Sequence, residues 1–378
     1  MKGITPIIAA AVLCSFSFLF PMEGEFNVIK NPKPTFTEKT AVPLKLTGQS
    51  EENENDKIFM ARPGSMAVDS DSNLFIYDTK QVQIFKYNKD LKAVKTAGRK
   101  GEGPGEFKVF GGQGRVVLYF ANKKLYAYND MSSKILTFDS NLNLKDEQVY
   151  QKRYHSRQMV VDNCDNIYFN DVKEAIHVVD QEMNIKWKLL EKNQLFDFIF
   201  FEAPEGILKN PFKSRLLPMN FEMSNGTDFI VYSPLTANIF VFRKNQLIRK
   251  IACYSQPMLD KFKIKLEKSR AMRKKIRERR RREDKRQSGF SLVYIYVSFF
   301  MDKDDQRFFY LQYNNKENKS IKLYRFSLEG KLDSVYVTDV KEIVGKYIDI
   351  YFKTKKSRSF YAMNRDGKIF KFAAAKGL

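Results

Sequence analysis

Short runs of apolar and aromatic residues alternate with polar turns along most of the chain. One unit recurs six times: an apolar strand, a polar turn, and a second strand that opens with isoleucine. Between 9 and 13 residues separate the start of the first strand from that isoleucine in every copy. This spacing predicts two antiparallel strands joined by a short hairpin. The six copies begin at LFIYD (74–78), LYAYND (125–130), IYFND (167–171), FIVYS (229–233), FFYLQYN (308–314) and FYAMN (360–364).

Further strands are expected on both sides of these hairpins. A polar turn and a third strand follow each of the first five copies, and another strand candidate precedes most of them. The upstream candidates are MAVD (66–69), RVVLYF (115–120), MVVD (159–162), VYIYVSFF (293–300) and YIDIYF (347–352). Four short strands per repeat, six times over, indicate an all-β fold, a six-bladed β-propeller. Blades packed around an axis bury apolar faces that one sheet alone would leave exposed to water.

The sixth copy has no fourth strand after its hairpin. The segment AVPLKLTG (41–48) precedes the first blade and has strand character. We therefore expect residues 41–48 to form the outer strand of the last blade, so that residues 23–378 make one closed propeller.

The N-terminal segment predicts export. Lys2 is followed by an uncharged, mostly apolar run from Gly3 to Met22, which indicates that residues 1–22 are a signal peptide or an N-terminal anchor. Cys14 suggests lipid attachment, but the bulky Leu13 before it disfavours that alternative. The expected location is periplasmic or extracellular, with a membrane anchor as the alternative. After loss of the signal, Cys164 and Cys253 remain, either as separate thiols or as a disulfide.

A glycine-rich segment lies between the first and second repeats. GRKGEGPGEF (98–107), together with MAVDSDSNLFIYD (66–78) and IFKYNKDLKAV (84–94), resembles the NHL repeat, and the chain resembles secreted bacterial six-bladed propeller proteins of undefined function. The other blade junctions lack this loop. Clustered glycines favour a structural turn over a phosphate site, because the Lys-Ser/Thr of a P-loop is missing. The loop positions of the pattern are occupied by Gly98, Gly101, Gly103, Pro104, Gly105 and Phe107.

Residues with catalytic or metal-binding chemistry are few. The only histidines are His155 and His177, which is too few for the several histidines that a propeller zinc or lyase site requires. We predict no catalytic residue and no cofactor, with Ca²⁺ as the alternative at Asx residues that end strands, although such residues usually cap turns. A channel or loop ligand would meet Asp69, His155, Arg157 and Asp162.

Half of the net charge of +22 lies in one segment. Residues 261–286 hold 15 Lys or Arg and 4 acidic residues, without Gly or Pro. They predict a basic helix in an insertion at 255–289, between the fourth and fifth blades. Its arginines would face solvent, an anionic surface or nucleic acid, and export argues against nucleic acid. The arginines in question are Arg277, Arg279, Arg280, Arg281 and Arg282.

The function expected from the sequence is binding. We predict a non-enzymatic, monomeric scaffold of the NHL-like propeller type that engages a protein, a glycan or a small molecule through its channel mouth or loops. A propeller hydrolase or lyase with a metal in the channel is the first alternative. Binding of an anionic surface or nucleic acid through the basic helix is the second.

Overall fold

The computed structural model describes residues 41–50, 60–110, 115–150, 158–171, 175–189, 220–224, 228–233, 238–243, 246–252, 264, 268, 271, 298–302, 307–314, 320–339, 353–355, 359–364 and 367–374. The predicted signal segment, His155, Arg157 and the five arginines of the basic segment lie outside these residues. Only Ile264, Lys268 and Ala271 of the predicted insertion are described, so the basic helix stays a prediction. Among the described residues, no helix is long and apolar enough to cross a membrane.

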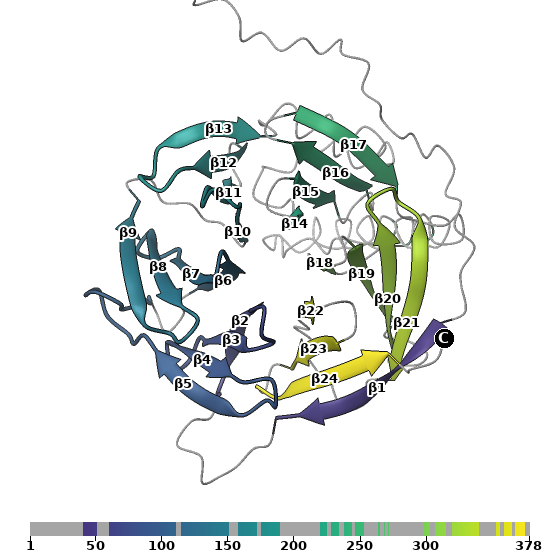
Figure 1. Ribbon diagram of the computed structural model, residues 1–378, viewed down its shortest axis with the longest axis horizontal. Helices are drawn as coiled ribbons and strands as arrows, with labels where there is room; N and C mark the ends of the chain where they lie inside the picture. The colour runs from purple at the N-terminus through teal and green to yellow at the C-terminus, as the bar shows by residue number, and fades with distance from the viewer. Residues whose placement is uncertain are drawn as a thin grey trace, which may run out of the picture.

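The described residues form 24 strands in sheets arranged in a ring around a central axis, which defines a β-propeller (Figure 1). Sheet 1 contains β2 (Pro63–Val68), β3 (Leu74–Asp78), β4 (Gln83–Tyr87) and β5 (Ala93–Ala97). Sheet 2 contains β6 (Val116–Ala121), β7 (Lys124–Asn129), β8 (Lys134–Asp139) and β9 (Leu144–Val149). Sheet 3 contains β10 (Met159–Val161), β11 (Ile167–Asp171), β12 (Ala175–Val179) and β13 (Ile185–Leu189). Sheet 4 contains β14 (Asn220–Ser224), β15 (Asp228–Ser233), β16 (Asn238–Arg243) and β17 (Gln246–Ala252).

The remaining eight strands form one continuous sheet, which we call the closing sheet. Its order is β18-β19-β20-β21-β1-β24-β23-β22. The strands are β18 (Ser298–Asp302), β19 (Arg307–Asn314), β20 (Ser320–Ser327), β21 (Leu332–Asp339), β1 (Ala41–Gln49), β24 (Ile369–Ala374), β23 (Ser359–Met363) and β22 (Lys353–Lys355). All six predicted hairpins are confirmed as antiparallel strand pairs.

The expectation of six separate sheets is corrected, because the described strands form five hydrogen-bonded sheets. The reason is that β1 pairs with two strands at once. Residues Ala41–Pro43 run parallel to β21, and residues from Leu44 to Gln49 run antiparallel to β24. The sequence pattern of β1 shows that it is a strand, but it does not show that the strand is shared.

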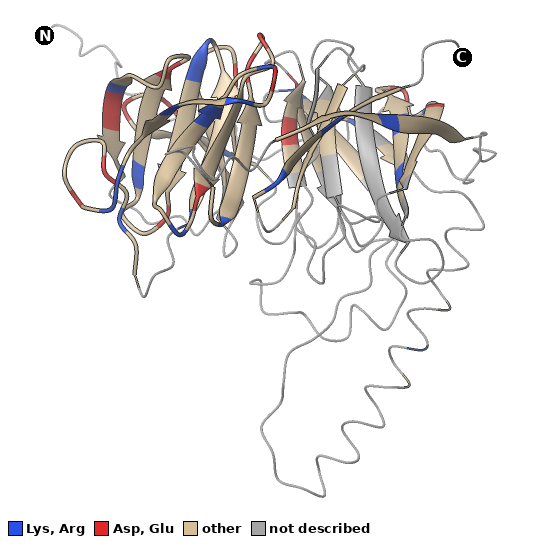
Figure 2. Ribbon diagram, turned by 90° about the horizontal axis from the view of Figure 1, so that it is seen from below, with Lys and Arg blue, Asp and Glu red and all other residues tan. Residues whose placement is uncertain are grey.

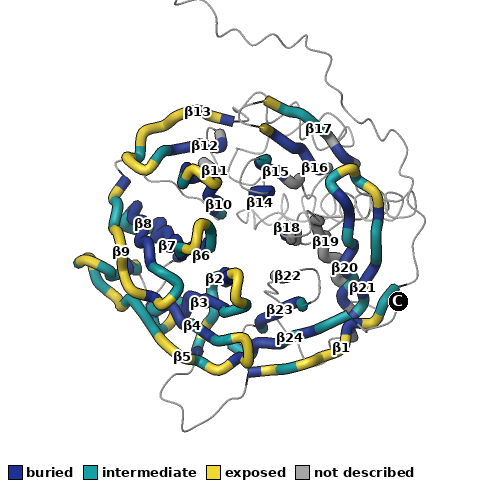
Figure 3. The backbone as a smooth tube through the Cα atoms, viewed as in Figure 1, coloured by how far each residue is buried: buried dark blue, intermediate teal, exposed yellow. Residues whose placement is uncertain are grey.

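In sheets 1 and 2, burial is highest in the two middle strands and lowest in the outermost strand (Figure 3). Every residue of β3 is buried, because that strand is covered on both faces by neighbouring sheets. The outer strand β9 has no buried residue. In the side view, acidic and basic residues of the described strands intermingle rather than separate by sign (Figure 2).

Candidate functional site

One face of the ring carries the described turns that join the first strand to the second and the third to the fourth in sheets 1 to 3, together with the turn between β20 and β21. These turns leave from the same end because successive strands of a sheet run in opposite directions. We call this end the turn face. Six of the described turns on this face share one design: 69–73, 88–92, 139–143, 162–166, 180–184 and 327–331.

The common design is a five-residue turn capped by its first side chain. The backbone N–H of the first residue donates to the carbonyl of the fifth, and the fifth N–H donates to the side chain of the first. The fourth residue has a positive φ in all six turns, including Ser72, Leu142 and Met183. A seventh turn of this design, 364–368, joins β23 to β24 and so lies at the opposite end of the strands.

Asp69 and Asp162, both predicted to meet a ligand, are the capping residues of two such turns. Asp162 Oδ1 accepts hydrogen bonds from the backbone N–H groups of Cys164 and Asn166, each at 2.8 Å, and Oδ2 accepts one from Asn166 Nδ2 at 2.7 Å. Asp69 makes the equivalent bonds in sheet 1. Both carboxylates therefore accept hydrogen bonds from the backbone of their own turns, which is the usual role of Asx residues at strand ends.

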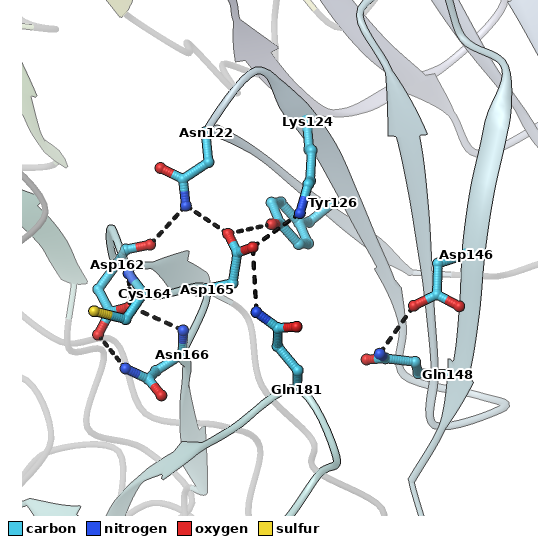
Figure 4. Close-up of polar contacts among 10 residues, drawn as sticks. All are labelled: Asn122, Lys124, Tyr126, Asp146, Gln148, Asp162, Cys164, Asp165, Asn166 and Gln181. Atoms are coloured by element: carbon cyan, nitrogen blue, oxygen red, sulfur yellow. Dashed lines mark hydrogen bonds and ion pairs between the residues drawn. The ribbon is translucent and has the colours of Figure 1, made fainter.

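Asp165 links sheets 2 and 3 on the turn face (Figure 4). Its Oδ1 accepts hydrogen bonds from Asn122 Nδ2 at 2.5 Å and from the Tyr126 hydroxyl at 2.8 Å. Its Oδ2 accepts from Lys124 Nζ at 2.8 Å and from Gln181 Nε2 at 3.4 Å. Three of these four donors belong to the β6–β7 hairpin of sheet 2, so the carboxylate fixes one blade against the next.

The protonation of Asp165 follows from these contacts. Burial raises the pKa of the carboxyl, but hydrogen bonds from Lys124, Asn122 and Tyr126 outweigh burial and lower it overall. Burial, and then the hydrogen bond to Asp165, raise the pKa of Tyr126, so the phenol stays protonated as a donor. A carboxyl with a lowered pKa in the folded state stabilises the fold above its unfolded pKa of about 3.9, and this contribution is lost as pH falls through the folded value.

We expect Asp165→Asn to lower the free energy of unfolding at pH 7 by about 1.5–3 kcal/mol, the range for hydrogen bonds to a charged group. Asparagine tolerates the positive φ of this position, so the backbone need not change. The loss should shrink as the pH falls below the unfolded value of about 3.9 and through the lowered pKa of the wild-type carboxyl, because that group then becomes protonated. Urea titrations at several pH values measure it, with Asp146→Asn as control, since the Asp146 carboxylate bonds only within its own strand β9 (Figure 4). Equal losses at both positions would contradict this role of Asp165.

The same type of contact recurs around the ring. Lys95 Nζ of sheet 1 donates to Asn143 Oδ1 in a turn of sheet 2, at 2.8 Å. Arg249 of sheet 4 donates to the Leu328 carbonyl in a turn of the closing sheet, at 2.8 Å. At the junction of the closing sheet with sheet 1, Lys371 donates to the Lys89 carbonyl at 3.3 Å. These three turns, 139–143, 327–331 and 88–92, are thus capped internally and tied to the preceding sheet.

A buried carboxylate lies on an innermost strand, and the sequence analysis missed it. Glu222 of β14 is 7% exposed, and its charge contributes to the raised pKa of Tyr119, after the larger effect of burial. Tyr119 belongs to β6, two sheets away, and its hydroxyl accepts a hydrogen bond from the Met223 backbone N–H. Tyr119 therefore joins the innermost strands of two non-adjacent sheets. The signal for this site is the acidic residue within the apolar strand NFEMS (220–224), a strand that the repeat search did not find.

The glycine loop is held as a structural element. Its Gly105 N–H donates to Glu147 Oε2 at 2.8 Å, and its Gly103 N–H donates to Glu106 Oε2 at 2.8 Å. Lys134 Nζ donates to the Gly103 carbonyl at 3.0 Å and lies 2.6 Å from Glu147 Oε1. These two loop N–H groups thus donate to carboxylates of the protein itself.

His177 is fully buried within β12. Cys164 is an exposed free thiol, and Cys253 lies outside the described residues. In the part of the chain that the structure describes, no three His, Cys, Asp or Glu side chains come together as a metal site.

Comparisons with known proteins identify the fold of this chain alone. No protein-family model matches the sequence, and no curated protein matches it. Among solved structures, the chain is similar to a protein of Bacteroides fragilis that is named as exported, with 13% identity and a TM-score of 0.54 over 91% of this chain and 98% of that one. At this identity the similarity concerns the fold alone.

Two enzymes show weaker similarity. A gluconolactonase of Xanthomonas campestris has 8% identity and a TM-score of 0.48, over 90% of this chain and 99% of that one. Virginiamycin B lyase of Staphylococcus aureus has 9% identity and a TM-score of 0.46, over 88% of this chain and 100% of that one. Both scores are below 0.5, so we take nothing about catalysis from these enzymes.

Proposed function

We propose that this protein is an exported binding scaffold of the NHL-like, six-bladed propeller type, and that the turn face is its contact surface. The six-blade count is supported by the closing sheet, which divides at β1 into β18–β21 and the set β22, β23, β24 and β1, each with four strands. The NHL-like assignment is supported by the glycine loop, in which Gly98 and Gly105 have positive φ. Export is supported by the apolar run at residues 3–22, which follows Lys2.

The observation that carries the binding proposal is the construction of the turn face. Six of its described turns have one design, and hydrogen bonds from the preceding sheet fix several of them. A surface whose loops are already ordered loses little conformational entropy on binding. The exposed turn tips are polar, which suits a ligand that presents hydrogen-bonding groups. They include Lys89, Asp90, Asn141, Asn163, Gln181 and Glu182.

A hydrolase or lyase with a channel metal is the second candidate, and Glu222 favours it. A buried carboxylate on an innermost strand is a suitable oxygen ligand for Ca²⁺. Tyr119 beside it would add a hydroxyl group. The two candidates therefore differ in whether the folded protein retains a metal ion in the channel.

Metal analysis of the purified full-length protein separates these two functions. After equilibration with Ca²⁺ and Zn²⁺ and then desalting, we expect well under one equivalent of either metal. The same preparation is applied to a glycan array. The double variant Asp90→Arg with Glu182→Arg, on the turn face, should weaken binding. The control Val149→Arg, at the end of β9 that lies away from the turn face, should leave binding unchanged. If the wild-type protein retained one equivalent of metal and the Glu222→Gln variant did not, the scaffold proposal would be overturned in favour of the channel-metal enzyme.

A further inference from the structure

Strand β1 closes the ring and also joins two halves of the closing sheet. It lies on the outside of the ring, alongside both β24 and β21 (Figure 1). Its register on β24 shifts between Leu46 and Gly48, and Thr47 Oγ1 there donates to the Lys371 carbonyl at 3.1 Å. After β1, Ser50 exchanges hydrogen bonds with the backbone of Ile369. The chain then continues to sheet 1, so β1 connects the last strands with the first sheet.

The side chains of β1 contribute little burial. Leu44 is the one buried residue among its nine, at 7% exposure. It packs in a cluster with residues of β18, β20, β21, β23 and β24, including Tyr336 and Phe360, whose ring centroids are 5.4 Å apart. Leu46, two positions later, is 45% exposed. Backbone pairing, the buried Leu44 and the partly buried Val42, which packs against the same cluster, therefore hold β1 in place.

Apart from β1, side chains make the contacts between the closing sheet and sheet 1 that the structure describes. These contacts include a cluster in which Tyr361, Met363 and Ile369 pack against residues of β2, β3 and β4. The Ser72 hydroxyl also bonds Tyr361. Regions with few buried apolar contacts open locally at a lower free energy than the whole fold. β1 meets this condition, whereas the fully buried β3 does not.

We propose that β1 is a releasable strap: its detachment opens the ring between β24 and sheet 1 while sheets 1 to 4 stay folded. Release frees the outer edges of β21 and β24 together, because the same strand covers both. The ring therefore closes in the same event in which β1 joins the two halves of the closing sheet. Leu44 sets the opening equilibrium.

Hydrogen exchange of the full chain, read by mass spectrometry under native conditions, tests the strap. In Leu44→Ala, amides of β24 should exchange about 30-fold faster, which corresponds to the ~2 kcal/mol at the lower end of the cost of truncating a buried leucine. Amides of β3 and β7 should keep their wild-type rates. The matched control Leu46→Ala, on the same strand, should change β24 exchange by no more than about twofold. Equal acceleration in β3, β7 and β24 would overturn the proposal, because β1 would then open only with the whole protein.

A disulfide provides a second test if Leu44→Ala fails to fold. Lys45 and Ala373 are directly opposed in the β1–β24 ladder. In a Cys164→Ser background, Lys45→Cys with Ala373→Cys should slow β24 exchange when oxidised and restore it when reduced. Unchanged exchange in the oxidised protein would show that β24 does not open through release of β1.

Discussion

Phe107→Ala is expected to lower the free energy of unfolding by about 3–5 kcal/mol, the cost of truncating a buried phenylalanine. Phe107 is fully buried and meets the Tyr77 ring edge-on, with centroids 5.3 Å apart. It also fixes the glycine loop, because a Cβ atom at Gly98 would lie 2.3 Å from Phe107 Cε2. The alanine variant leaves a cavity between sheets 1 and 2 and removes the base of the loop.

Urea denaturation, followed by the fluorescence of the single tryptophan, Trp187, measures the effect. Phe110→Ala is the control, because Phe110 lies in the same segment and is 80% exposed. A surface substitution of this kind stays within about 0.5 kcal/mol. If both alanine variants lost the same free energy, the buried role of Phe107 would be refuted.

Glu147→Gln is expected to lower the free energy of unfolding by about 3 kcal/mol, because it leaves the buried Lys134 ammonium without its charged partner. The Lys134 side chain is 6% exposed and that of Glu147 is 23% exposed. Since Glu147 retains some contact with water, the expected loss is at the lower end of the roughly 3–5 kcal/mol for a broken buried pair. The glycine loop should loosen as well, because Glu147 and Lys134 both bond its backbone.

The matched control is Glu102→Gln. Glu102 pairs with Lys108 at 2.9 Å, but its side chain is 72% exposed. An exposed pair contributes roughly 0–1 kcal/mol. A double variant, Lys134→Met with Glu147→Leu, should be more stable than Glu147→Gln, because no buried charge is left unpaired. A double variant less stable than Glu147→Gln would show that the ion pair itself, and not the lone charge, determines the loss.

Some site residues could be found from the sequence, and others could not. Asp69 and Asp162 stand out because each ends an apolar strand, and the structure places both at turns of one face. The partners of Asp165 could not be predicted, because Asn122, Lys124 and Tyr126 lie about 40 residues earlier, in another sheet. Glu222 was missed because its strand contains only five residues with an acidic residue at the centre, a weak alternation signal.

The sequence by itself determined the hairpins, the turns and the glycine loop of this protein. These depend on contacts within about ten residues, and their apolar spacing and turn residues record which side of each strand is buried. Only the tertiary structure decided which sheets share a strand, which turns are tied together, and that Tyr119 reaches the strand of Glu222. Such contacts depend on how the sheets are arranged around the axis, and side-chain alternation along one strand carries no information about its neighbour in the ring.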